Sequence, residues 1–198
     1  MLQPASQNLS CDYVDIGGEQ FFRIANVHKM DEFFLSIVSA FDHWMFITSQ
    51  GALTAGRKNS SNSLFPYYCA DKIIDGSSST GSLTIVRIEG QDGQLFHWSP
   101  MARVSIAATN VSRSLYRNVN GSKIIFEEIN HELELTFRYS WRFSQKFGFV
   151  RESCLSNNSL QTKSCTVLDG IQNILPASIV PTLQMRFSNH GDAYKKSE

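Results

Sequence analysis

The sequence predicts an all-β protein, a large antiparallel β-sandwich with a short helical linker segment at its C-terminal end. Short segments rich in β-branched and aromatic residues recur along most of the chain, separated by polar or turn-forming residues. Asn-Gly and Asp-Gly pairs join neighbouring segments, as is typical of β-hairpins. Helical patterns do not alternate with the strands, so a parallel sheet with crossover helices is disfavoured. We expect roughly nine or ten strands.

The first strand-like segments are residues 19–26, 33–41 and 43–51. Residues 52–82 are different, because they are rich in Gly, Ser and Asn and read as one long loop. A loop of that length inside a compact domain is usually either disordered or functional. The aromatic group FPYY at residues 65–68 argues against disorder, because disordered segments contain few such residues.

Strand patterns resume at residues 82–90 and 94–101, with an Asp-Gly turn between them. Residues 114–141 then predict a three-stranded meander, in which Asn-Gly at residues 120–121 is expected to form a type I′ turn. In its third strand apolar and polar residues alternate, so one face should be buried and the other in water. The apolar members are Leu133, Leu135, Phe137 and Tyr139.

The last predicted strands are residues 147–157 and 164–173, after which Pro181 could open a helix. We therefore divide the chain into an N-terminal extension at 1–18, a β-sandwich at 19–176 and the start of a helical linker at 177–198. The linker pattern leads us to expect that the chain is a piece of a larger protein with a downstream domain.

Composition limits the classes of partner. With 198 residues, of which 42% are apolar, the chain can bury the core of one domain. Its 18 basic and 18 acidic residues cancel, and no apolar stretch approaches the length of a membrane span. We expect neither a nucleic-acid nor a membrane partner. No dinucleotide, P-loop or zinc-protease motif is present, so no cofactor is expected.

The four cysteines are widely spaced and include no C-x-x-C pair, which disfavours a metal site. Reduced thiols are the expected state, and the N-terminus has no signal-peptide pattern. Both observations favour a cytoplasmic location. The cysteines are Cys11, Cys69, Cys154 and Cys165.

A carbohydrate site is predicted around one tryptophan and the long loop. Sugars present an apolar C–H face and a ring of hydroxyls, so their sites pair aromatic rings with hydrogen-bonding side chains. The alternative is that the tyrosines only pin the loop while the acidic and basic residues stay in water. The candidate carbohydrate-binding residues are Trp44, Arg57, Asn62, Tyr67, Tyr68, Asp71 and Lys72.

Two further groups have weaker functional interpretations. Asp169, Gln172 and Asn173 could cap turns, or they could contribute to a cleft at a domain interface. A proton-transfer pair could come from His97 or His131 with a glutamate. Adjacent Glu127 and Glu128 would face opposite sides of a strand, which leaves at most one of them in any pocket. No catalytic residue is assigned.

Four stretches resemble a known family: FDHWMFITSQGALTAGRKNSSNSLFPYYCADKI, FEEINHELELTFRYSW, FGFVR and DGIQNILP. They are similar to the N-terminal region of bacterial carbohydrate-active proteins related to cellobiose phosphorylases and amylo-α-1,6-glucosidase-like glycoside hydrolases. The resemblance implies a galactose-mutarotase-like β-supersandwich, followed by a helical linker and an (α/α)6 barrel that holds the catalytic carboxylates. It also implies that residues 21–198 support the barrel and line its sugar cleft without being catalytic themselves.

The leading hypothesis is thus the supporting domain of a glycoside hydrolase or phosphorylase, with carbohydrate and a helical barrel of the same polypeptide as partners. The alternatives are a free-standing carbohydrate-binding module and an aldose epimerase that uses the two histidines. A supporting domain should expose apolar side chains where its partner domain packs. We expect Ile171, Ile174, Leu175 and Ile179 to contribute to that surface.

Overall fold

A computed structural model describes residues 8–66, 70–90, 92–102, 110–176, 179–180 and 183. Nearly all of its regular structure in this part is β-strand. One short helix, α1 (Ala70–Asp75), and two 3-10 turns, η1 (Val27–Lys29) and η2 (Ser60–Asn62), are also present. The strands are β1 (Ser10–Ile16), β2 (Glu19–Ala25), β3 (Phe34–Ile37), β4 (His43–Thr48), β5 (Leu53–Arg57), β6 (Gly81–Glu89), β7 (Leu95–Trp98), β8 (Val111–Asn118), β9 (Lys123–Asn130), β10 (Leu135–Ser144), β11 (Gly148–Asn157) and β12 (Ser164–Gln172).

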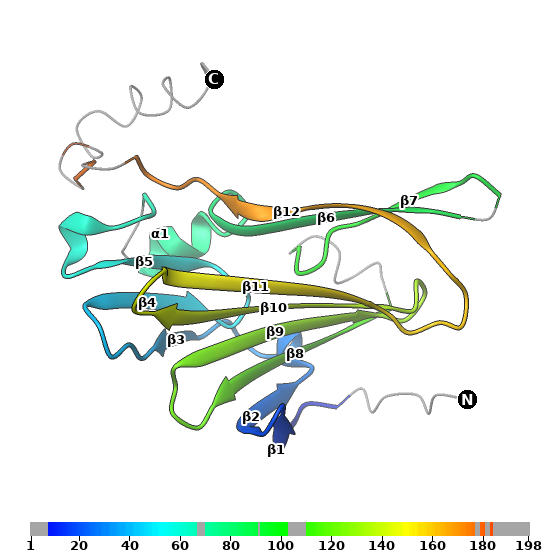
Figure 1. The fold of residues 1–198 in the computed structure, drawn as a ribbon, viewed down its shortest axis with the longest axis horizontal. Helices are drawn as coiled ribbons and strands as arrows, with labels where there is room; N and C mark the ends of the chain where they lie inside the picture. The colour runs from blue at the N-terminus through cyan, green and yellow to red at the C-terminus, as the bar shows by residue number, and fades with distance from the viewer. Residues whose placement is uncertain are drawn as a thin grey trace.

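The strands form three antiparallel sheets (Figure 1). The main sheet has six strands in the order β1-β2-β8-β9-β10-β11. The β6 sheet has three strands in the order β12-β6-β7, and the β4 sheet has three in the order β3-β4-β5. The prediction of an antiparallel, sandwich-like all-β protein is therefore confirmed.

The hydrophobic core lies on the inner face of the main sheet. Alternate residues of β10, Leu135, Phe137 and Tyr139, are buried there, as the sequence pattern predicts. Both small sheets cover this face, since Val86 of β6 and Ile47 of β4 belong to the same core cluster. Figure 1 shows the β6 sheet lying over β10 and β11, with the β4 sheet beside it.

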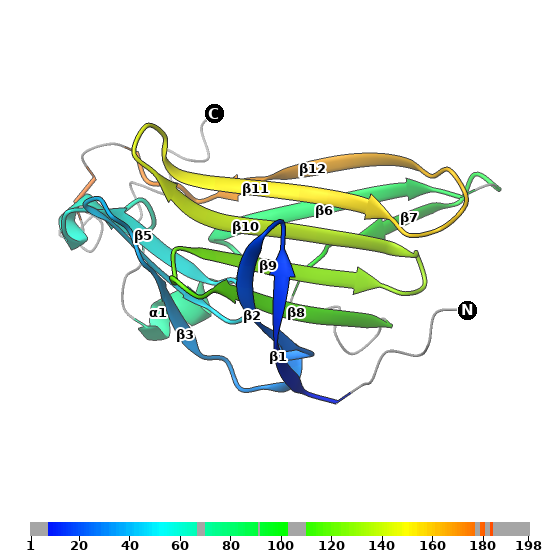
Figure 2. The ribbon, with the colours of Figure 1, turned by 60° about the horizontal axis from the view of Figure 1, so that its bottom comes forward.

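The outer face of the main sheet is partly covered as well. Figure 2 shows the β1–β2 hairpin crossing in front of β8 and β9, where Phe21 and Tyr116 form a second buried cluster. The expectation that the polar face of β10 would lie in water is therefore wrong for Ser140, which is 7% exposed, and on the neighbouring strand β9 Glu127 is only 4% exposed. Its carboxylate accepts a hydrogen bond from Tyr116 Oη at 2.6 Å and forms an ion pair with Arg138. Burial, and then this hydrogen bond, raise the pKa of Tyr116 to about 12.

Some local predictions need correction. Residues 52–82 are not one long loop, because they contain β5, η2 and α1. The hairpin between β8 and β9 exists, but Asn120 does not have the positive φ of a type I′ turn and only Gly121 of the pair does, at +70°. Four residues, 119–122, separate the two strands, so the connection is longer than a two-residue type I′ turn and Asn120 does not need a positive φ. Pro181 and most of the helix expected after it lie outside the described residues.

Candidate functional site

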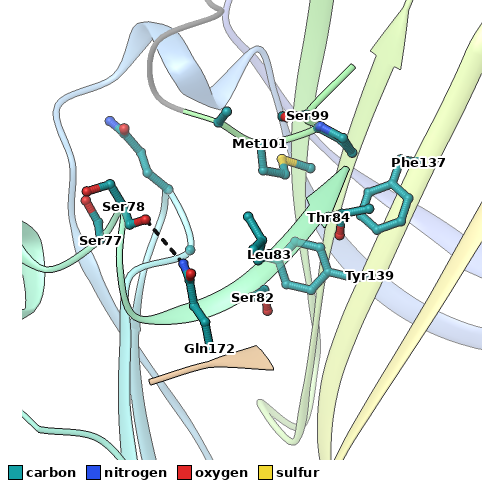
Figure 3. A pocket seen from close by; sticks show the side chains of 14 residues that line it. Ser77, Ser78, Ser82, Leu83, Thr84, Ser99, Met101, Phe137, Tyr139 and Gln172 are labelled. Atoms are coloured by element: carbon teal, nitrogen blue, oxygen red, sulfur yellow. Dashed lines mark hydrogen bonds between the residues drawn. The ribbon is translucent and has the colours of Figure 1, made fainter. Parts of the chain in front are cut away.

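A cavity of about 160 Å³ lies between the β6 sheet, the β4–β5 turn and β10 (Figure 3). Phe137 and Tyr139 form one wall of the cavity. The remaining wall is rich in uncharged hydrogen-bonding side chains, which are Gln50, Ser77, Ser78, Ser82, Thr84, Ser99 and Gln172. Since a water molecule occupies about 30 Å³, the cavity holds about five waters or one small polar group. It is smaller than the sites of roughly 300 Å³ or more that enclose whole drug-sized ligands.

The end of β12 closes this cavity. Gln172 donates from Nε2 to the backbone oxygen of Ser78 at 3.2 Å, the bond drawn in Figure 3. The next residue, Asn173, has a φ of +60° and donates from Nδ2 to Thr80 Oγ1 at 2.8 Å. Gln172 therefore lines a cavity within this chain, while Asn173 fixes the chain after β12 to the loop before β6.

Asp169 belongs to a polar junction between the main sheet and the β6 sheet. Arg151 on β11 binds both of its carboxylate oxygens, Nη1 to Oδ2 at 2.7 Å and Nη2 to Oδ1 at 2.8 Å. Thr84 Oγ1 on β6 donates to Oδ1 at 2.6 Å, and Ser153 Oγ on β11 donates to Oδ2 at 2.5 Å. Arg151 Nε also donates to Ser82 Oγ at 3.1 Å, so one guanidinium connects β11, β12 and β6.

The environment of Asp169 keeps its carboxylate ionised. Partial burial raises its pKa, but the hydrogen bonds from Arg151, Ser153 and Thr84 outweigh that effect and lower the pKa from 3.8 to about 2. The guanidinium carbon of Arg151 lies 5.0 Å from the ring centroid of Tyr139, which is a cavity wall. The Arg151–Asp169 junction thus packs against the Tyr139 ring that lines the cavity.

An aromatic platform lies on the β4 sheet and consists of Phe34, Trp44 and Phe46. The register places these three side chains on one face, since Trp44 and Phe46 are two residues apart and Phe34 neighbours Phe46 diagonally. The rings of Trp44 and Phe46 are 6.1 Å apart. Phe34 is 40% exposed and Phe46 is 48% exposed, so solvent reaches the platform.

Gly56 allows the Trp44 ring to lie against β5. A Cβ atom at Gly56 would be 2.4 Å from Trp44 Cζ2 and 2.6 Å from the backbone oxygen of Asn62, which is too close for any other residue. The indole Nε1 donates to the backbone oxygen of Asn59 at 3.3 Å. Asn62 in turn donates from Nδ2 to Asn59 Oδ1 at 2.9 Å, so two amide side chains lie beside the platform.

The structure brings together only some of the predicted carbohydrate-binding residues. Trp44 and Asn62 meet at Gly56, as just described. Arg57 is paired with His43 in the β4 register, so it faces the opposite side from Trp44, and it forms an ion pair with Asp42 at 2.9 Å. Tyr67 and Tyr68 lie outside the described residues, as do the side chains of Asp71 and Lys72 on α1.

Sequence reasoning missed three members of this region, Phe34, Phe46 and Asn59. The alternation in HWMFIT places Phe46 on the same strand face as Trp44 and could have identified it. Phe34 becomes a neighbour of Phe46, and Asn59 a neighbour of Trp44, only through the pairing of β3 and β5 with β4, which the sequence does not specify.

The two histidines do not form a catalytic pair. His131 lies in the β9–β10 turn and is bonded to Ser112 Oγ at 2.8 Å, whereas His97 is an exposed residue of β7. Neither lines the cavity of Figure 3. Glu127 and Glu128 face opposite sides of β9, as predicted, since the first binds Tyr116 and the second binds Trp98 of the β6 sheet. The geometry therefore gives no support to an aldose epimerase.

Other site chemistries are absent from the part of the chain that is described. No three His, Cys, Asp or Glu side chains there lie close enough together to hold a metal ion. Cys11, Cys154 and Cys165 are free thiols, and Cys69 lies outside the described residues. None of the described helices is long and apolar enough to cross a bilayer.

Comparison with known proteins does not assign a family. No protein-family model matches this chain, and no curated protein is significantly similar to it.

Proposed function

We propose that this chain is a non-catalytic carbohydrate-binding β-sandwich of a sugar-processing protein. The observation that carries the proposal is the aromatic platform, in which Phe46 is exposed to solvent and Trp44 is half-buried, beside Asn59 and Asn62. Aromatic faces pack against the C–H face of a sugar ring, and amide side chains donate to and accept from its hydroxyls. A neutral glycan is the ligand class that fits, because these four side chains are uncharged.

The resemblance of FDHWMF…CADKI and DGIQNILP to cellobiose phosphorylase-like and amylo-α-1,6-glucosidase-like proteins supports the same proposal. On this view the three antiparallel sheets belong to a galactose-mutarotase-like supersandwich, and the parent is a glycoside hydrolase or phosphorylase. Its catalytic carboxylates would belong to a helical barrel. The chain described here would hold and orient sugar without transferring protons.

Trp44→Ala and Phe46→Ala are each expected to weaken glycan binding about tenfold or more, which corresponds to about 1.4 kcal/mol of binding free energy. The physical reason is the loss of one stacking surface with the fold unchanged. A glycan array followed by calorimetry on the best neutral ligand measures the effect. Gly56→Ala should weaken binding similarly, because the added Cβ displaces the Trp44 indole although the tryptophan itself is unchanged.

Tyr13→Ala is the matched control, since Tyr13 is a 66% exposed aromatic residue on β1 of the main sheet. It should leave glycan affinity unchanged. If no neutral glycan in a broad panel binds the wild-type protein, or if Trp44→Ala binds as well as wild type, the proposal is wrong.

A second candidate function, support of a neighbouring domain, is favoured by exposed apolar residues along β12 and after it. Ile171 is 37% exposed and Ile174 is 50% exposed, as a docking surface at this end of the chain requires. Leu175 and Ile179 are less exposed, because both are half-buried. The backbone N–H of Leu175 donates to the backbone oxygen of Leu64. Leu168 on β12 is 62% exposed. Apolar side chains exposed in such a group commonly mark an interface.

Leu168→Lys and Ile174→Lys are expected to lower the fluorescence of the dye ANS bound to the protein, because each removes apolar surface from this region. Circular dichroism should remain unchanged, since both side chains are exposed. Leu160→Lys is the control, because Leu160 is fully exposed in the β11–β12 connection, away from this group. Equal fluorescence in all three variants would contradict a docking surface at β12.

A further inference from the structure

A second cleft, of about 350 Å³, lies where four segments of the chain meet. These are the start of β2, the loop after β3, the turn between β8 and β9, and the end of β10. Its volume falls within the range of small-molecule sites. None of the aromatic platform residues lines it, so it is a separate site. Its polar and charged lining residues are Glu19, Ser39, Ser122, Lys123 and Arg142, and its aromatic ones are Phe41 and Phe143.

Two cations face each other across neighbouring strands in this cleft. Lys123 on β9 is directly paired with Arg142 on β10, so their Cβ atoms are about 4.5–5.5 Å apart on the same sheet face. Like charges placed directly opposite in a sheet destabilise the pairing. An anion that binds between the two charges would therefore stabilise the folded protein.

Lys123 is available to bind an anion. Among the described residues no carboxylate forms an ion pair with it, and its ammonium nitrogen lies 5.9 Å from the ring centroid of Phe21. Arg142 is paired with Glu152 at 2.8 Å, but both side chains are about half exposed, at 47% and 52%. Exposed pairs of this kind are weak and exchange readily with other ions.

The walls of the cleft are held in place before any ligand binds. Asn118, which is 3% exposed, donates from Nδ2 to Glu19 Oε1 at 2.7 Å and to Ser122 Oγ at 2.9 Å. Its Oδ1 accepts from the backbone N–H of Lys123 at 2.9 Å. The backbone N–H of Val38 donates to the oxygen of Gly121 at 2.8 Å, which fixes the loop after β3. A preorganised site loses less entropy when a ligand binds.

We propose that this cleft binds a small hydroxylated organic anion, of which a sugar acid or a sugar phosphate is the model. The acidic group would lie between Lys123 and Arg142, where it relieves the repulsion of the cation pair. The Glu19 carboxylate accepts hydrogen bonds from ligand hydroxyls and disfavours an anion that lacks donors. Phe41 would contact the apolar face of the ligand, whereas the Phe143 ring faces the core and stacks on His43.

The test is calorimetric titration of the wild-type chain with glucuronate, glucose 6-phosphate and glucose. At least one of the two anions should bind at least about tenfold more tightly than glucose, and which one binds distinguishes a carboxylate from a phosphate ligand. Lys123→Gln combined with Arg142→Gln should weaken anion binding at least about tenfold. Higher salt should weaken it too, because the cleft is open to solvent. Arg87→Gln, an exposed cation on β6, is the control and should have no effect.

Thermal unfolding gives a second measurement with the same proteins. Without ligand, Lys123→Gln should unfold at the same or a higher temperature than wild type, because the repulsion is removed. The bound anion should raise the unfolding temperature of wild type and not that of the double variant. Trp44→Ala should keep anion binding, so failure of this site and failure of the glycan platform are distinguishable. Equal binding of glucose and both anions, or unchanged binding in the double variant, would overturn the proposal.

Discussion

Glu128→Gln is expected to lower the free energy of unfolding by about 3–5 kcal/mol, because it removes one partner of a buried ion pair. Glu128 is completely buried and accepts hydrogen bonds from Arg113 Nε at 2.6 Å, Trp98 Nε1 at 2.7 Å and the Met101 N–H at 2.8 Å. Glutamine would leave the Arg113 charge uncompensated in a site where its side chain is only 6% exposed. Urea denaturation followed by circular dichroism measures the loss.

Two comparisons test this explanation. Glu152→Gln breaks the half-exposed pair with Arg142 and should cost less than about 1 kcal/mol. Replacing both buried partners, with Glu128→Leu and Arg113→Met together, should recover much of the loss, because no lone charge then remains in the core. A single-variant cost below about 1 kcal/mol would contradict the importance assigned to this pair.

Arg151→Met is expected to cost about 2–3 kcal/mol of unfolding free energy, because it leaves the Asp169 carboxylate without its main partner while keeping the apolar stem. The wild-type guanidinium is 7% exposed on its side chain and binds both carboxylate oxygens. The cost is smaller than for Glu128 because Asp169 is more accessible, at 21% of its side chain. Thermal and urea unfolding at neutral pH measure it.

The same junction predicts an acid dependence. The pKa of Asp169 is lowered in the folded protein to about 2, below the usual 3.8, so its contribution is present above about pH 4 and is lost as the pH falls towards 2. Because solvent partly screens the carboxylate, this contribution is about 1–2 kcal/mol. Arg151→Met should flatten the stability profile between these pH values. Asp42→Asn, which breaks an exposed pair, should leave the profile close to wild type, and equal profiles for Arg151→Met and wild type would contradict the prediction.

Strand positions could be predicted from the sequence wherever the side-chain period is strong. β10 is the clearest case, since Leu135, Phe137 and Tyr139 alternate with polar residues and are buried. β5 was missed because LTAGR lacks the bulky residues that mark a strand and lies in a Gly- and Ser-rich region. The reason for a small residue in β5 is seen only in the folded protein, where Gly56 leaves room for the Trp44 ring.

The candidate site was predictable only in part, because sequence does not specify which strands pair. Trp44 and Asn62 could be predicted from residue type, but their meeting depends on the β4–β5 register. The Arg151–Asp169 junction joins strands of two different sheets, and no local pattern indicates it. Asp169 was predicted to cap a turn or to contribute to a domain interface, and in the structure it binds Arg151 of the same chain.

The pairing of β6 with β12 has a consequence for how the protein is made. One edge of β6 (residues 81–89) can form its hydrogen bonds only after residues 164–172 of β12 have been synthesised. The register pairs Gly81 with Gln172 and Glu89 with Ser164. A ribosome adds about 5–20 residues per second, so the nascent chain spends several seconds with that apolar edge open. Pairings this distant in sequence also form slowly once the chain is complete. Translation pauses before residue 164, and nonsense truncations there, should therefore yield aggregates rather than a smaller folded domain.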